Sequence, residues 1–266
     1  PPVTDTPTPE IYTYTESSAA SDVYKRQIQL PAEQSLSLWM FAADALDRAE
    51  GYGGQPPSQE AKAILRIATP VLKFRATRDG RRVTGDAMEM RGGIGYVEEW
   101  ANPRLVRDAH LGSIWEGAGN VVAIDVVQRA IRRHACHEPF SAAVRAKLDD
   151  ATDVPAAHLA AIRATLDKAG LLAGAVAADP ASEIESRRAT TMLYHATTAA
   201  LMAWEANEIH KRRGDARRLL WSKLILDHKL TPRDPFGQAG TDHEDAIATC
   251  LLGDRPAAMA KVAELL

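Results

Sequence analysis

The sequence predicts an all-α protein, and three observations support that prediction. Apolar residues recur at helical spacing in several long segments, the pattern of helices that bury one face. Gly, Pro and Asn residues stand where those segments begin and end. No segment alternates apolar and polar residues over the length of a strand. With 45% hydrophobic and 25% charged residues, the 266-residue chain has the composition of an ordinary globular protein.

The first residues of the chain are expected to lie outside the fold. Residues 1–9 are rich in Pro and Thr, and residues 22–27 read DVYKRQ, which is the translation of a common sequencing-library adapter. We therefore expect residues 1–27 to be a non-native or disordered leader. Turn-forming residues then divide the remainder into a helical bundle, residues 28–136, and an additional helical domain, residues 150–266.

Four helices are expected in the first half. Residues 34–50 show helical spacing, and the loop GYGGQPP ends that helix. Ser58 then caps a helix that reaches the next glycine pair, with Pro70 either kinking it or beginning a new one. An Asn-Pro pair at 102–103 opens a short helix, and an apolar helix follows over residues 121–134. The side chains of this last helix that should face the core are Val121, Val122, Ile124, Val127 and Ile131.

The second half should be helical throughout. The expected helical segments are residues 141–148, 155–168, 182–212, 215–228 and 242–266. Two cysteines, Cys136 and Cys250, are too few for a disulfide framework, which favours a reducing compartment, and we expect a cytoplasmic protein. No apolar run reaches the roughly 18 residues of a membrane-spanning helix, so no membrane association is expected.

Residues 90–120 are the most informative part of the chain. They read MRGGIGYVEEWANPRLVRDAHLGSIWEGAGN, in which two glycine clusters flank a short basic helix. Glycine costs about 1 kcal/mol inside a helix, so such clusters mark turns or close approaches of the backbone to another group. Glu116 lies between Trp115 and Gly117, where the indole would exclude water and favour a general base. An acid near a helix start is also stabilised by the helix dipole, so both interpretations stay open.

Three motifs in this region resemble the C-terminal helical domain of the acyl-CoA dehydrogenase family. GGIGY at 92–96 resembles that family's GGxG[YF], PRLVRD at 103–108 resembles its short helix with RD, and IWEG at 114–117 resembles its I[YW]EG. Order and spacing agree, and the resemblance extends over residues 36–134. The combination WEGAGN, with more helices after it, is most similar to the AidB-like (adaptive-response) branch.

The resemblance implies an FAD-dependent oxidoreductase. In this family a glutamate at the EG position removes the α proton of an acyl-CoA while hydride leaves to the flavin, so Glu116 is the expected base. The residues that the resemblance places near FAD are Arg91, Gly92, Gly93, Trp115, Gly117, Ala118, Gly119 and Asn120. It also implies a homo-oligomer, a tetramer or dimer of dimers, in which residues 91–93 lie near the FAD pyrophosphate of a neighbouring subunit. The implied substrate is an acyl-CoA or a similar acyl thioester.

Several positions depart from the family pattern. Ala118 stands where many members have a hydroxyl residue, Asn120 where a Gln is common, and Ile94 where an Asn is usual. We therefore expect contacts to FAD that differ in detail. The family's N-terminal helical domain and middle β-domain would precede residue 28 and supply much of the flavin and substrate site. The chain is thus expected to be a fragment that is not a competent enzyme alone.

A basic cluster in the second half suggests another function. Residues 187–233 contain ten Lys or Arg and four acids. The densest part of this window is Lys211, Arg212, Arg213, Arg217 and Arg218. With two tryptophans nearby, this cluster would suit DNA phosphates, and DNA binding through the C-terminal domain is attributed to the AidB-like branch. The other interpretation is a solvated helix face whose cations pair with Glu205, Glu208 and Asp215.

Three functions therefore remain open from the sequence. The first is an acyl-CoA dehydrogenase-like flavoenzyme, the second an AidB-like flavoprotein that binds DNA with little or no dehydrogenase activity, and the third a helical assembly domain without catalysis. A flavin spectrum would separate the first two from the third. His134, Cys136 and His137 lack a second cluster at ligand spacing, so no metal site is expected.

Overall fold

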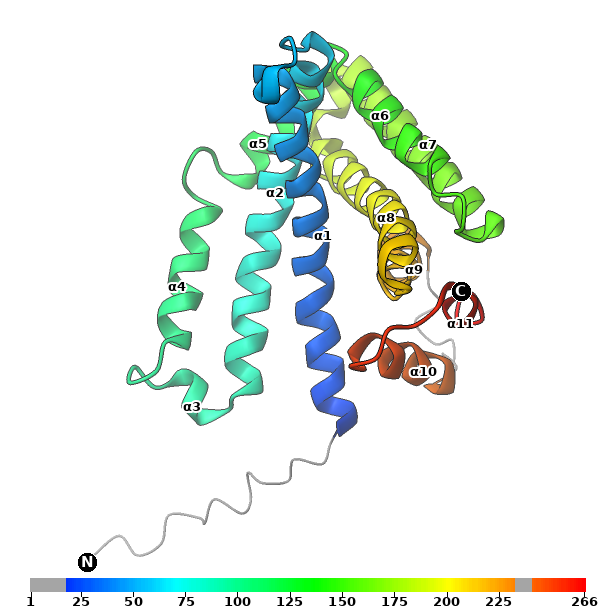
Figure 1. The fold of residues 1–266 in the computed structure, drawn as a ribbon. Helices are drawn as coiled ribbons and strands as arrows, with labels where there is room; N and C mark the ends of the chain where they lie inside the picture. The colour runs from blue at the N-terminus through cyan, green and yellow to red at the C-terminus, as the bar shows by residue number, and fades with distance from the viewer. Residues whose placement is uncertain (1–17, 233–240) are drawn as a thin grey trace, which may run out of the picture.

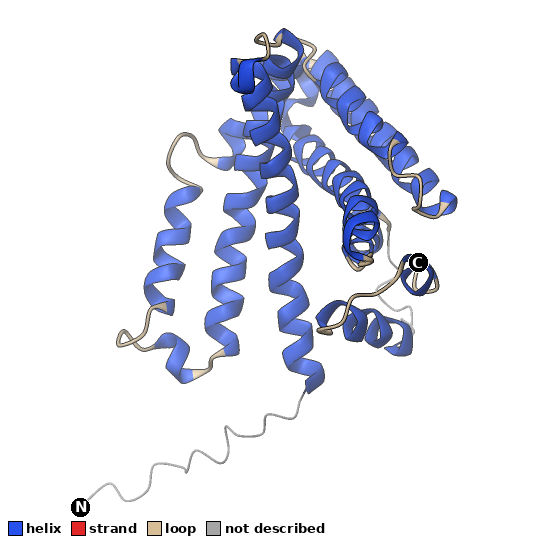
Figure 2. Cartoon of the chain, in the orientation of Figure 1, coloured by secondary structure: helices blue, strands red, loops and turns tan. Residues whose placement is uncertain are grey.

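The computed structural model describes residues 18–232 and 241–266, and all regular structure in those ranges is helical (Figure 2). Two long helices form the centre of the first half. Helices α1 (Ser18–Glu50) and α2 (Gln59–Met90) lie side by side and are joined through a 3-10 turn at Tyr52–Gly54 (Figure 1). The expected all-α class is confirmed.

Helix α1 begins much earlier than expected. The structure continues it back to Ser18, so residues 18–27 are helical, whereas the assignment of residues 1–27 to a non-native or disordered leader stays a prediction. This stretch contains no glycine or proline to break a helix. The end of this stretch also contacts the second half of the chain, because the Arg26 guanidinium donates to the carbonyl oxygen of Glu244 at 3.3 Å. Residues 1–17, the rest of the expected leader, lie outside the described residues.

Helix α2 begins where the sequence indicates. The Ser58 side chain accepts a hydrogen bond from the backbone N–H of Ala61 at 3.1 Å, which satisfies one of the free donors of the first turn. Pro70 lies inside the helix, which continues without a break to Met90. Of the two expected alternatives, one helix with an internal proline is therefore confirmed.

Three short helices follow α2. They are α3 (Gly93–Tyr96), α4 (Asn102–Gly112) and α5 (Gly119–Asp125), and α5 continues as a π-helical turn over Val126–Ile131. Helix α4 lies beside α2 (Figure 1). The expected inward face of α5 is mostly correct, but Val121 is 61% exposed. It precedes the buried Val122 in the first turn and therefore points to another side of the helix.

The second half adds further helices around α8. They are α6 (His137–Asp149), α7 (Ala156–Ala178), a 3-10 segment (Pro180–Glu185), α8 (Ser186–Arg213), α9 (Arg218–Ile225), a π turn (Leu226–Leu230), α10 (Thr241–Leu252) and α11 (Met259–Ala263). The last expected helix, residues 242–266, is thus divided in two, because Gly253 and Pro256 interrupt it. No helix in the described ranges is long and apolar enough to cross a bilayer.

Helix α8 joins the two halves. It packs against α1, α6, α7 and α9, and alanines on its buried faces let these helices approach closely. A polar contact also crosses this boundary, since buried Gln34 lies 3.0 Å from Nδ1 of His195. One continuous core therefore includes side chains from Leu30 to Leu265. The division into residues 28–136 and 150–266 stays a prediction.

Candidate functional site

Glu116 lies in an exposed turn between α4 and α5. Its φ of 55° places it in the left-handed region, which a residue with a side chain rarely adopts without support. Gly117 follows with a φ of 110°, which only glycine adopts readily. The turn between the two helices is therefore built so that one carboxylate projects from it.

Lys73 on α2 holds this turn. Its ammonium donates to the carbonyl oxygen of Trp115 at 2.7 Å and also to that of Gly117, the residues on either side of Glu116. A charged donor that bridges two carbonyls fixes the peptide planes around the residue between them. Sequence reasoning missed Lys73, because it precedes Trp115 by 42 positions and belongs to no motif around it.

The surroundings of Glu116 are open rather than dry. Trp115 is 67% exposed, and Ile114 and Val121 are exposed as well. With two thirds of Trp115 exposed, its indole is largely open to solvent in this chain, and the exclusion of water from the carboxylate stays a prediction. What the structure presents is a carboxylate within a patch of exposed apolar side chains.

The first turn of α5 lies against a cation from α2. A methyl group placed on Gly119 would lie 3.6 Å from Nη1 of Arg78 and 3.7 Å from the ring of Phe74. The Arg78 guanidinium lies over that ring, 5.8 Å from its centroid. Burial, and after it the positive charges of Arg187 and other arginines, lower the pKa of Arg78. Arg78 and Arg187 were not predicted, because folding alone brings these distant positions together.

The second glycine cluster forms a different turn. Helix α2 ends at Met90, and Arg91, Gly92 and Gly93 are exposed there. Gly95 is buried, and a methyl group on it would lie 2.2 Å from the carbonyl oxygen of Met88. Gly95 thus allows α3 to pack closely on the end of α2, whereas Gly92 and Gly93 leave open space above the backbone.

The structure does not bring the two groups of predicted cofactor residues together. Residues 91–93 and residues 115–120 lie at opposite ends of α4 (Figure 1). An 11-residue helix is about 16 Å long. The two groups would therefore contact one molecule only if it extended along α4, or they would contact separate molecules.

These residues fit a flavin dinucleotide chemically. Arg78 and Arg91 would complement phosphate charge, and exposed Trp115 and Val121 offer apolar surface to a flat ring beside Glu116. Ala118 starts α5 without a side-chain cap, so the next backbone N–H groups have no side-chain acceptor from that residue.

The predicted DNA-binding cluster does not form one exposed patch. Arg218 is 16% exposed and pairs with both Glu33 and Glu205, and Arg217 pairs with Asp215 at 2.8 Å. Lys211 and Arg212 pair with Glu208 at 3.8 and 3.5 Å. The charges of Arg217 and Arg218 serve ion pairs within the chain, and their contact with DNA stays a prediction that nothing in the structure supports. The alternative of cations paired with Glu205, Glu208 and Asp215 is confirmed.

Comparisons with known proteins agree with the motifs. Residues 26–131 match the family described as acyl-CoA dehydrogenase, C-terminal domain. AidB from Escherichia coli (strain K12) is 45% identical over 71 residues, which are 26% of this chain and 13% of AidB. Acyl-CoA dehydrogenase family member 11 from Caenorhabditis elegans is 35% identical over 102 residues, 38% of this chain and 16% of that protein. The chain thus matches less than a fifth of the length of either relative.

Solved structures show that the fold is shared beyond the matched segment. Caenorhabditis elegans ACDH-11 in complex with C11-CoA superposes with a TM-score of 0.67 at 22% identity, covering 77% of this chain and 35% of that one. The apo form of Bd2924 gives a TM-score of 0.55 at 24% identity, covering 72% of this chain and 34% of that one. Residues 26–131 thus resemble the C-terminal domain of the acyl-CoA dehydrogenase family in their motifs and in the match to its family model.

Proposed function

We propose that this chain is the helical part of an FAD-dependent oxidoreductase that acts on acyl-CoA or a similar acyl thioester, with Glu116 as the base. The observation that carries the proposal is the Glu116 turn. Within the family segment, a single carboxylate projects from a left-handed turn that Lys73 bridges on both sides. The similar ACDH-11 structure was determined in complex with C11-CoA, which supports an acyl-CoA as the substrate class.

In the proposed reaction Glu116 takes up a proton. Its carboxylate accepts the proton from the α carbon of the acyl thioester, and the β carbon loses a hydride, which leaves a double bond between the two carbons. Bound FAD would supply the chemistry of hydride acceptance. Lys73 keeps the backbone around Glu116 in place while the proton moves, because it holds the carbonyl groups of the residues before and after Glu116.

The two glycine groups would serve different FAD molecules. Trp115, Gly117, Ala118, Gly119 and Asn120 would line the cofactor next to Glu116, with Arg78 near its phosphates. Residues 91–93, at the far end of α4, would contact the cofactor of a second copy. A homo-oligomer also agrees with the large apolar side chains exposed on α1 and in the α3–α4 region, which include Trp39, Met40, Tyr96, Trp100 and Leu105.

Flavin uptake tests the proposal directly. The chain is joined to the N-terminal helical domain and middle β-domain that the resemblance implies, the joined protein is titrated with FAD while flavin absorbance and fluorescence are recorded, and acyl-CoA is then added to look for bleaching of the flavin band. We expect Glu116→Gln to keep FAD but to lose the bleaching. Glu138→Gln, which removes an exposed carboxylate on α6, is the matched control and should behave like the parent. No flavin binding, or equal bleaching in Glu116→Gln, would contradict the proposal.

A further inference from the structure

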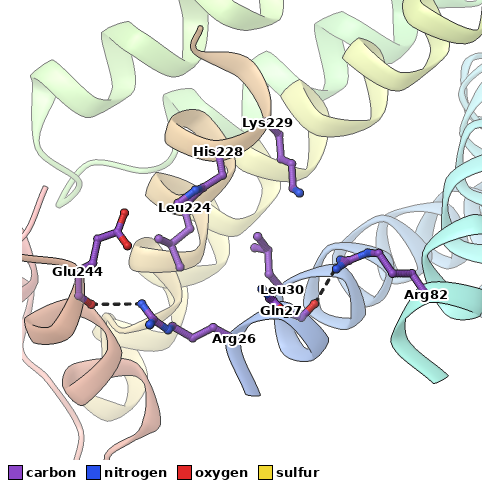
Figure 3. Close-up of a pocket in the computed structure, with 8 residues that line it drawn as sticks. All are labelled: Arg26, Gln27, Leu30, Arg82, Leu224, His228, Lys229 and Glu244. Atoms are coloured by element: carbon purple, nitrogen blue, oxygen red, sulfur yellow. Dashed lines mark hydrogen bonds between the residues drawn. The ribbon is translucent and has the colours of Figure 1, made fainter. Parts of the chain in front are cut away.

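A cavity lies away from the Glu116 turn, between α1, α2, α10 and the π turn after α9 (Figure 3). Its volume is about 310 Å³, at the lower end of the size of small-molecule sites. Leu30 and Leu224, both buried, form its apolar wall. The other walls are mostly cationic, since Arg26, Arg82 and Lys229 line it together with His228.

Lys229 is the unusual member of this set. It is half-buried and makes no hydrogen bond or ion pair with any residue in the described ranges, although a buried charge is costly unless it is paired. Figure 3 shows its ammonium directed across the cavity toward Arg82. Burial, and after it the charges of Arg82 and Arg75, lower the pKa of Lys229. An anion in the cavity would supply the missing partner.

The neighbouring carboxylates already have partners. Asp79 accepts two hydrogen bonds from Arg75, both at 2.9 Å, and Asp86 accepts one from Arg82 at 3.2 Å. Among the described residues that line the cavity, Glu244 is the one acid, and its carbonyl oxygen accepts from Arg26. The second terminal nitrogen of Arg82 donates to the carbonyl oxygen of Gln27 at 3.3 Å, a weak contact that an anion can replace.

We propose that this cavity binds a small phosphorylated molecule whose phosphate group lies between Lys229 and Arg82. Two cations on opposite walls suit the double charge of a phosphate monoester, and Leu30 and Leu224 would contact its organic part. Arg26 belongs to the adapter-like stretch, so the site is assigned to Lys229 and Arg82 alone. The proposal does not depend on the function of Glu116, which lies on another part of the chain.

Calorimetric titration with inorganic phosphate and with phenyl phosphate tests this site. We expect phenyl phosphate to bind more tightly than phosphate, because its ring reaches the leucines. Lys229→Gln should raise the Kd of both ligands by about tenfold, the usual effect of losing one charge-assisted hydrogen bond. Lys62→Gln removes the same charge from an exposed position on α2, about 30 Å along the helix from Arg82, and should leave binding unchanged.

Further variants keep the outcome clear. If Lys229→Gln fails to fold, as judged by circular dichroism, Arg82→Gln replaces it with the same expectation. Arg26→Gln should weaken binding only modestly. Phosphate that binds Lys229→Gln as tightly as the parent would overturn the proposal, and so would a parent chain that shows no binding at millimolar phosphate. Tighter binding of inorganic phosphate than of phenyl phosphate would overturn the assignment to a phosphorylated organic molecule.

Discussion

The ammonium of Lys73 lies 2.7 Å from the carbonyl oxygen of Trp115, and the same ammonium donates to the carbonyl of Gly117. One side chain on α2 thus holds the carbonyl groups of both residues that flank Glu116. In the proposed reaction the position of the Glu116 carboxylate therefore depends on α2, although no atom of α2 takes part in the transfer of the proton or the hydride.

Replacing Lys73 should therefore impair turnover more than folding. For Lys73→Met we expect a loss of about 1 kcal/mol in the free energy of unfolding, because two hydrogen bonds at a partly exposed turn are lost. In protein that oxidises acyl-CoA, kcat should fall about tenfold or more with a smaller change in KM, since the base is misplaced. Lys73→Arg should restore part of kcat. Equal losses of kcat in Lys73→Met and Lys62→Met would contradict the role of Lys73 in positioning Glu116.

Glu116→Gln should reduce acyl-CoA oxidation far more than any neighbouring change. Removing a general base lowers a rate by about 10²–10⁴, because an amide cannot accept the α proton. Steady-state assays with an artificial electron acceptor give the rate, and Glu138→Gln is the control that loses a carboxylate elsewhere. A rate within threefold or so of the parent would exclude Glu116 as the base.

Gly95→Ala should be strongly destabilising. The added methyl group would lie 2.2 Å from the carbonyl oxygen of Met88 and 2.9 Å from Cβ of Arg91, so α3 must move away from α2. Overpacking of this kind costs about 1–3 kcal/mol or more. Urea unfolding followed by circular dichroism measures it. Gly93→Ala is the control, because its methyl group would meet nothing within 4 Å, and its midpoint should stay near the parent value.

Arg218 should be important for stability although it lies within a basic stretch. Arg218→Met leaves Glu33 and Glu205 without their shared partner, and breaking a largely buried ion pair costs about 3–5 kcal/mol. Arg212→Met removes an exposed cation and should cost about 1 kcal/mol or less. Chemical denaturation of both variants tests the difference, and similar midpoints would show that burial of Arg218 is not important.

Acid should weaken the fold through two buried histidines. Burial lowers the pKa of His158 to about 4 and that of His195 to about 3, both below the value of 6.5 in an exposed chain. Below pH 6.5 the unfolded chain takes up protons that the folded chain does not, so the free energy of unfolding decreases as the pH is lowered. Each histidine contributes at most about 1.4 kcal/mol per pH unit, until the pH reaches its folded pKa. His158→Asn should reduce this slope between pH 6 and 4 in urea unfolding; an unchanged slope would refute the assignment.

Local signals in the sequence predicted local structure well. Ser58 begins α2 because its side chain needs only a backbone donor three residues later. Glu116 could be selected because its motif is contiguous. Lys73 and Arg78 could not, because their positions near the turn depend on how α2 packs beside α4 and α5. Charge density likewise gave no sign that Arg218 pairs with Glu33, since that partner lies 185 residues away.

The contact between Gln34 and His195 can form only late in the synthesis of the chain. The two residues are 161 positions apart, and a ribosome adds about 5–20 residues per second, so Gln34 emerges roughly 8–30 s before its partner. During that time α1 and α2 can pair, but the face of α1 that α8 will cover has nothing to cover it. The nascent α1–α2 hairpin therefore exposes apolar surface until α8 has been synthesised.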